Sequence, residues 1–184
     1  MRFTSILAAA LACAATSAMA DTTVIHAGSV IRDADAQPSG PATIVVTDGR
    51  ITSIVDGHVL IDGSDRTIDL ADKTVLPGLI DLHTHLSGDP SGEFWREAVE
   101  PVEWAAFVAA KNARLTALAG FTTVRDLGSA SDQVTQALRR ATAEGVVPGP
   151  RVITSGRTIA IVGGHGDING FRREVNDALG TSFA

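Results

Sequence analysis

The chain has 184 residues, of which 45% are hydrophobic and 20% charged, a composition typical of globular proteins that excludes wholesale disorder. Its formal net charge is −6 and its basic residues form no cluster, so we expect no nucleic-acid partner and no binding to an anionic membrane surface. Beyond the N-terminal segment, no apolar run approaches the roughly 20 residues that span a bilayer.

The N-terminal segment, residues 1–20, is typical of a signal peptide. Arg2 and the free amine give a positive start, residues 6–15 are apolar and mostly small, and Ala18-Met19-Ala20 fits the cleavage rule. The single cysteine, Cys13, lies inside this leader, so the mature chain would have no disulfide and no cysteine metal site. We therefore expect an exported protein, periplasmic or secreted, cleaved after Ala20. A lipoprotein box ending at Cys13 and an uncleaved amphipathic helix are the alternatives.

Residues 21–75 are predicted to form a small antiparallel β unit, because short β-branched runs alternate with turn residues and no long helical period occurs. Asp48-Gly49 lies between two such runs, and this dipeptide favours a two-residue hairpin because glycine accepts a positive φ. A small turn is expected to separate the first two strands. The expected strands are 23–26, 29–31, 42–46, 51–55 and 67–70.

From residue 74 onward the pattern predicts alternating strands and helices, and hence a parallel sheet with right-handed crossovers. The first strand, within 74–83, is mostly apolar, as expected for a strand buried on both faces. Trp104 and Phe107 recur at helical spacing and are expected in the core, and Ser129 with Asp132 forms a possible capping box. The other expected elements are a helix over 102–119 ended by Gly120, a strand at 122–125, a helix from about 132 to Gly145, and a strand at 151–154.

The most informative motif is Pro77-Gly78-Leu79-Ile80-Asp81-Leu82-His83-Thr84-His85. Residues two apart on a strand point to the same face, so His83 and His85 would converge at the end of the strand. Neutral imidazoles are good ligands for Zn²⁺ and similar ions. Asp81 shares their parity and is a candidate to orient an imidazole. The alternative is a pair of polar residues on a strand rim.

At these residues the sequence resembles the metal-dependent amidohydrolase superfamily, whose members carry this nine-residue string on the first strand of a (β/α)₈ barrel, commonly after a small β-sandwich. Two further strings, residues 120–128 and residues 149–156 with the glycine-rich 163–167, look like the branch of imidazolonepropionase-like proteins and amidohydrolase-type Xaa-Pro dipeptidases. The resemblance implies an incomplete α/β fold: residues 21–75 would form the small antiparallel β-sandwich domain, and residues 76–184 would form strands 1–3 of the barrel.

The resemblance also implies a chemistry. His83 and His85 would bind the more buried of two divalent metals, usually zinc, and water activated by the metals would attack an amide carbonyl. The family's bridging carboxylated lysine, two further histidines and a proton-handling aspartate lie on later strands, and none is assignable here. The only lysines are Lys73 and Lys111, and the remaining histidines of the β-rich segment are His26 and His58, which we expect to be exposed or locally bonded.

Two other polar side chains are candidates for substrate binding. His165, in the glycine-rich loop after the third strand, would lie where barrel active sites lie and bond a substrate carbonyl or carboxylate; the alternative is a loop histidine facing water. Arg125 ends the second strand and would pair with a substrate carboxylate, or else with Asp126 or Asp81 as a structural ion pair.

Taken together, the sequence predicts the N-terminal part of an exported, metal-dependent amidohydrolase acting on a small amide, an N-acyl amino acid or a dipeptide such as Xaa-Pro, with a homo-oligomer possible for the whole enzyme. The alternative is a catalytically inactive truncated fragment or pseudo-enzyme, because two histidines fall short of the three protein ligands usual for catalytic zinc. Residues 77–184 also fall well short of the roughly 250 residues of a closed barrel.

Overall fold

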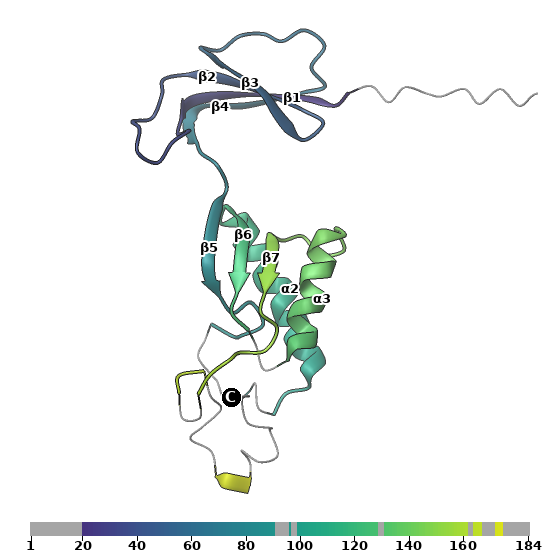
Figure 1. Ribbon diagram of the computed structural model, residues 1–184. Coiled ribbons are helices and arrows are strands. Elements are labelled where there is room, and N and C mark those ends of the chain that lie inside the picture. Colours follow the sequence, from purple (N-terminus) through teal and green to yellow (C-terminus); the bar gives the residue numbers. More distant parts are fainter. Residues whose placement is uncertain are drawn as a thin grey trace, which may run out of the picture. The chain divides into compact units, whose positions relative to one another are not determined.

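The computed structural model describes residues 20–90, 96, 99–128, 131–161, 164–166 and 172–174. The chain divides into two compact units, Met1–Pro77 and Gly78–Ala184, each with its own sheet (Figure 1). The expected leader lies, except for Ala20, outside the described residues, as do Ser129 and Gly163. In the part of the chain that is described, no helix is long and apolar enough to cross a membrane.

The N-terminal unit is a four-stranded sheet in the order β3-β2-β1-β4. The predicted hairpin is confirmed: β2 and β3 are antiparallel, and Thr47 pairs with Arg50 around the turn. Both turn residues have positive φ, 51° at Asp48 and 73° at Gly49, which gives the tight geometry that matches the twist of the strands. The four strands are β1 (Thr22–Val30), β2 (Ala42–Thr47), β3 (Arg50–Asp56) and β4 (Arg66–Val75).

Two predictions for this unit were wrong. The expected turn between two short strands is absent from the described residues, where β1 is continuous through Gly28. The sheet is also mixed rather than purely antiparallel, because β4 runs parallel to β1. The pairing partner of a strand is set by the returning chain and not by local composition, which explains the second error.

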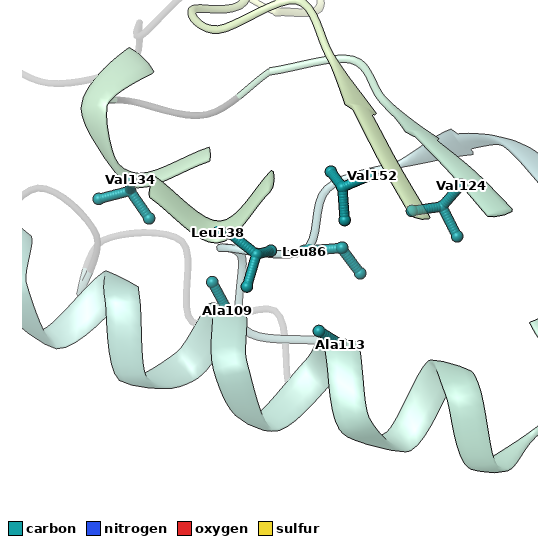
Figure 2. Packing of buried hydrophobic residues seen from close by; sticks show 7 residues of the cluster. All are labelled: Leu86, Ala109, Ala113, Val124, Val134, Leu138 and Val152. Carbon is teal, nitrogen blue, oxygen red and sulfur yellow. The ribbon is translucent and has the colours of Figure 1, made fainter. Parts of the chain in front are cut away.

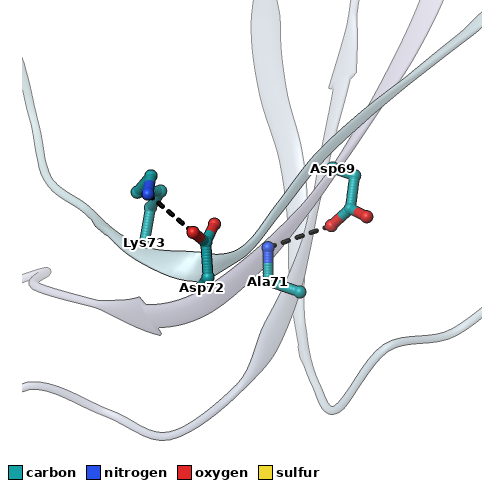
Figure 3. Close-up of polar contacts among 4 residues, drawn as sticks. All are labelled: Asp69, Ala71, Asp72 and Lys73. Carbon is teal, nitrogen blue, oxygen red and sulfur yellow. Dashed lines mark hydrogen bonds and ion pairs between the residues drawn. The ribbon is translucent and has the colours of Figure 1, made fainter.

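The irregular part of β4 explains why Gly28 does not make a turn. Between Ala27 and Ser29 on β1, the partner on β4 advances from Leu70 to Thr74, so β4 bulges over 71–73. The carbonyl of Ala71 lies so close to Gly28 that a Cβ there would overlap it. Within the bulge, Asp69 Oδ1 accepts the amide of Ala71 at 3.0 Å (Figure 3). Glycine is therefore needed for close strand approach at this position.

The C-terminal unit alternates strands and helices, as predicted. Its three strands are parallel in the order β5-β6-β7, and two helices follow β5 and β6 in the chain. Gly120 and Gly145 lie just past the two helices with φ of 95° and 72°, as expected for helix ends. The elements are β5 (Leu79–Thr84), α2 (Val102–Leu118), β6 (Phe121–Asp126), α3 (Asp132–Ala143) and β7 (Arg151–Thr154).

One core joins the sheet to the two helices. Strand residues Val124 and Val152 and helix residues Ala113 and Leu138 belong to the same buried cluster (Figure 2). Because α2 contributes alanines there, its backbone can approach closely. Leu86, directly after His85, is 5% exposed and belongs to the same cluster, so the loop that follows β5 is anchored in the core.

Three predictions about the C-terminal unit need correction. The first strand is shorter than expected and begins at Leu79, and its apolar residues Ile80 and Leu82 are 61% and 57% exposed, because the helix-bearing core covers only one face of the sheet. Trp104 and Phe107 are 53% and 70% exposed and contact each other, since α2 uses its small-residue face for the core. The N-cap of α3 is Ser131, without a side-chain capping bond.

The described residues are therefore mixed α/β, with two sheets and the helices α2 and α3. The described residues of the N-terminal unit form one sheet, so a second sheet of the expected sandwich is not among them.

Candidate functional site

His83 and His85 lie together at the carboxyl end of β5. Their ring centroids are 5.4 Å apart, with the planes at 66°, and both side chains are solvent-accessible. The carboxyl ends of β6 and β7 lie at the same edge of the parallel sheet, and this is the edge where α/β enzymes of the barrel type hold their sites. The structure thus brings the two predicted ligands together at an accessible sheet edge.

A hydrogen bond sets the ring chemistry of His85. Its Nδ1 lies 2.8 Å from the carbonyl oxygen of Gly128, in the loop after β6. A carbonyl only accepts hydrogen bonds, so Nδ1 must carry the proton and the lone pair is on Nε2. A ring nitrogen bonded to a backbone carbonyl is the common arrangement of a metal-ligating histidine. The donor set therefore fits a divalent ion held through His85 Nε2 and the neighbouring His83 imidazole.

Asp81 takes a different partner from the one its parity suggests. Its Oδ1 accepts the backbone amide of His83 at 2.9 Å. Asp81 pairs with Val124, which is buried in the core, and the register shifts between Asp81 and Thr84. This irregularity interrupts the strict alternation on which the parity rests. Asp81 thus supports the backbone of His83, and its role beside an imidazole stays a prediction.

Arg125 lies at this edge, and His165 lies in the segment that follows β7. Arg125 Nε donates to the carbonyl oxygen of Leu82 at 2.8 Å, so its side chain crosses β5 one residue before His83. In the described part of the chain Arg125 forms no ion pair with Asp81 or Asp126. His165 is exposed in a turn where the Gly164 amide donates to the carbonyl of Ile161 at 2.8 Å. Substrate contact by either residue stays a prediction.

Two residues that sequence reasoning did not assign to the site hold the loop after β5. Asp126 is fully buried, and its two carboxylate oxygens accept the backbone amides of Leu86 and Gly128 at 2.7 and 2.9 Å. Asn112 of α2 donates to the carbonyls of Leu86 and Gly88 at 2.8 and 2.9 Å. Asp126 lies two residues after the core residue Val124, so the strand alternation could have predicted that its carboxylate is buried. A buried carboxylate needs hydrogen-bond partners.

An open hollow lies beside this loop. It has a volume of about 440 Å³ and lies between residues 85–90 and α2. Its lining includes His85, Leu86, Gly88, Asn112, Leu115 and Thr116. The His85 side of the site is therefore open to solvent.

The two histidines of the N-terminal unit and one of the lysines have local structural partners. His26 and His58 stack with ring centroids 5.1 Å apart, and their Nε2 atoms lie 3.1 and 2.9 Å from the carbonyls of Val59 and Ala27. This confirms the expectation that they are locally bonded. Lys73 in β4 donates to Asp72 at 2.6 Å (Figure 3).

His83 and His85 alone are too few ligands for a complete metal site in the part of the chain that is described. Within the ranges given above, no three His, Cys, Asp or Glu side chains cluster closely enough to hold a metal ion. Catalytic zinc usually has three protein ligands and a water. The geometry thus offers two ligands and an open side for others.

The chain is similar to several known proteins. A solved Xaa-Pro dipeptidase with methionine bound in its active site superposes with a TM-score of 0.72 and 36% identity, over 84% of this chain and 38% of that one. The ochratoxinase of Aspergillus niger is 29% identical over 88% of this chain and 33% of its own length. The imidazolonepropionase of Klebsiella pneumoniae is 38% identical over 40% of this chain and 19% of its own.

This chain thus spans about a third of the length of the dipeptidase and the ochratoxinase. The likeness to both an imidazolonepropionase and a Xaa-Pro dipeptidase confirms the resemblance seen in the sequence. The model of the amidohydrolase family matches residues 74–179, which hold β5 to β7, both helices and the histidine pair. The chain belongs to the amidohydrolase family.

Proposed function

We propose that the protein containing this chain is a metal-dependent hydrolase of small amides, with His83 and His85 as two of its metal ligands. The observation that carries the proposal is the histidine pair with His85 in the Nδ1-protonated form, at the carboxyl edge of a parallel sheet. We further propose that residues 76–184 are the first three βα units of a (β/α)₈ barrel that later segments complete, after a small composite β-domain.

Each residue of this edge has a specific role in the proposal. His83 and His85 bind a divalent ion, zinc by preference, through their unprotonated nitrogens. When bound, such an ion would supply an activated water for attack on an amide carbonyl near neutral pH. Arg125, with Nε held by Leu82, offers the rest of its guanidinium to a substrate carboxylate. His165, exposed in its turn, donates to a substrate carbonyl or carboxylate.

For the substrate we propose a dipeptide with proline or another residue at its C-terminal side, or an N-acyl amino acid. Both end in a carboxylate, which the exposed Arg125 suits. The likeness to a Xaa-Pro dipeptidase supports the dipeptide.

The test uses the longer protein that carries this chain, loaded with zinc and assayed on panels of dipeptides and N-acyl amino acids. We expect turnover of at least one class and its loss on His83→Ala or His85→Ala. Arg125→Gln should raise KM for substrates with a free carboxylate more than for their amides. No turnover on either panel, with metal content unchanged in the two histidine variants, would overturn the proposal.

For the 184-residue chain by itself we propose negligible hydrolysis, because the described residues supply only two ligands. Stoichiometric zinc retained through gel filtration, together with turnover by the purified chain, would contradict this.

We also propose that the chain is exported and that its mature form begins at Asp21. Expressed with its leader in a bacterial host, the protein should accumulate in the periplasm and give Asp21 as the first residue on N-terminal sequencing. Replacing Ala18 and Ala20 by bulky residues should leave the leader attached, because the cleavage rule requires small residues there. A cytoplasmic product beginning at Met1 would refute the assignment.

A further inference from the structure

We propose that Asp126 is a positioning residue for the metal site: its buried carboxylate fixes the orientation and tautomer of His85, and Asn112 assists it from α2. This inference rests on the proposed function, since it concerns how well His85 can bind a metal. The hydrogen bonds of Asp126 go to backbone amides and not to either imidazole.

The carboxylate of Asp126 links the two backbone segments that determine where His85 points. Its Oδ2 accepts the amide of Leu86, the residue directly after His85, at 2.7 Å. Its Oδ1 accepts the amide of Gly128 at 2.9 Å. The carbonyl of Gly128 in turn accepts the bond from His85 Nδ1 at 2.8 Å. The peptide group that follows His85 is thus bonded directly to the Asp126 carboxylate, through the Leu86 amide. The His85 side chain is linked to the same carboxylate indirectly, through Gly128.

Asn112 holds the opposite side of the same peptide segment. Its side-chain amide donates to the carbonyls of Leu86 and Gly88, so the amide of Leu86 is held by Asp126 and its carbonyl by Asn112. The Leu86 side chain is buried in the core. The bond to Asp126, the bonds to Asn112 and the buried Leu86 side chain together restrain the loop after β5, and with it the position of the His85 imidazole.

Gly128 completes the arrangement through its backbone conformation. Its φ is 118°, and a Cβ there would overlap the backbone of Arg157 and Thr158. The packing and the bond to Asp126 together aim its carbonyl at His85 Nδ1.

Burial makes the carboxylate at this position specific. Asp126 is 0% exposed, and both of its oxygens act as acceptors. An asparagine of the same size has one acceptor oxygen and one amino group, so it would leave one backbone amide facing a donor. A buried unpaired donor is costly, and the loop would shift to relieve it. The Asp126 side chain therefore acts through its two acceptor oxygens, and an asparagine of the same size cannot replace it.

The first measurement needs no variant. Nitrogen-15 NMR of the histidine side chains in the 184-residue chain, with His85 assigned by comparison with His85→Gln, reports which ring nitrogen is protonated. We expect a single Nδ1-protonated form for His85. A dominant Nε2-protonated form would overturn the inference whatever the variants do.

The second measurement compares zinc affinity in Asp126→Asn, Asn112→Ala and the core control Val134→Ala, which truncates a buried side chain of α3 that forms none of these hydrogen bonds. Because outer residues that orient metal ligands typically account for about 10- to 100-fold in affinity, Asp126→Asn should weaken zinc binding by that factor and mix the His85 tautomers. Asn112→Ala should act in the same direction but less, and Val134→Ala should lower the unfolding temperature without either effect.

Unchanged affinity and a single tautomer in a folded Asp126→Asn protein would contradict the proposal. If that variant does not fold, Asn112→Ala decides: no loss of zinc affinity there contradicts it as well. If His83→Ala and His85→Ala bind zinc as the parent chain does, the proposed metal site itself is wrong, which is a different outcome.

Discussion

At the scale of single residues, Gly128 has no room for a side chain, whereas another glycine of the same unit does. Gly128 and Gly145 both have positive φ, but a Cβ at Gly145 would meet open space. We expect Gly145→Ala to cost about 1–2 kcal/mol of unfolding free energy from the backbone alone. Gly128→Ala adds steric overlap and should cost about 1–3 kcal/mol more. Urea unfolding of both variants measures the difference. Equal losses of unfolding free energy would show that the backbone of residues 157–158 moves aside at no cost.

Sequence reasoning reached the histidine pair but not the residues that hold it. His83 and His85 lie two apart in one strand, so a local periodicity brings them together. Asp126 and Asn112 act on Leu86 across 40 and 26 residues of chain, through backbone groups that have no sequence signature. Asp81 was placed by parity, and the register shift after it could not be foreseen from local composition.

At the scale of elements, α2 is apolar on two sides, and this misled the prediction of its core face. The large residues Trp104, Phe107, Leu115 and Leu118 are all more than half exposed, while Ala109 and Ala113 are fully buried. The large apolar side chains of α2 suggested the wrong face of the helix as its core face, because close packing on the sheet favours small residues here. Helices and strands themselves follow short-range periodicity and were predicted well. The parallel pairing of β4 with β1 depends on a long connection and was not predicted.

A pair of identical substitutions tests this orientation of the helices. Leu138 in α3 is 5% exposed and Leu118 in α2 is 69% exposed. Leu138→Ala should cost about 2–5 kcal/mol of unfolding free energy, because it removes buried contacts and leaves a cavity. Leu118→Ala should stay within about 0.5 kcal/mol of the parent chain. Chemical denaturation gives both values, and comparable losses would mean that the outer stripe of α2 is covered in solution.

At the scale of the whole chain, the described C-terminal unit presents apolar side chains on the sheet as well as on α2. Ile80, Leu82 and Ile153 are 61%, 57% and 53% exposed. Exposed apolar patches of this kind mark surfaces that other protein covers, or that associate. The 184-residue chain should therefore bind a hydrophobic dye and sediment as concentration-dependent oligomers.

The matched variant for that prediction is Leu82→Glu with Ile153→Glu. It should lower dye binding and shift sedimentation toward monomer without loss of stability, because both side chains lie outside the buried core. Dye binding that is absent in the parent chain, or unchanged in the double variant, would contradict the exposure of this face.

The central claim is that His83 and His85 are metal ligands, and the chain contains its own control in the second histidine pair. His26 and His58 are similarly close, but their Nε2 atoms are bonded to backbone carbonyls. The decisive measurement is equilibrium dialysis against zinc of the parent chain, His83→Ala/His85→Ala and His26→Ala/His58→Ala. The account predicts that the first double variant loses at least about tenfold in zinc affinity while the second binds as the parent does. Equal binding by all three proteins, or loss only in the second variant, would contradict it.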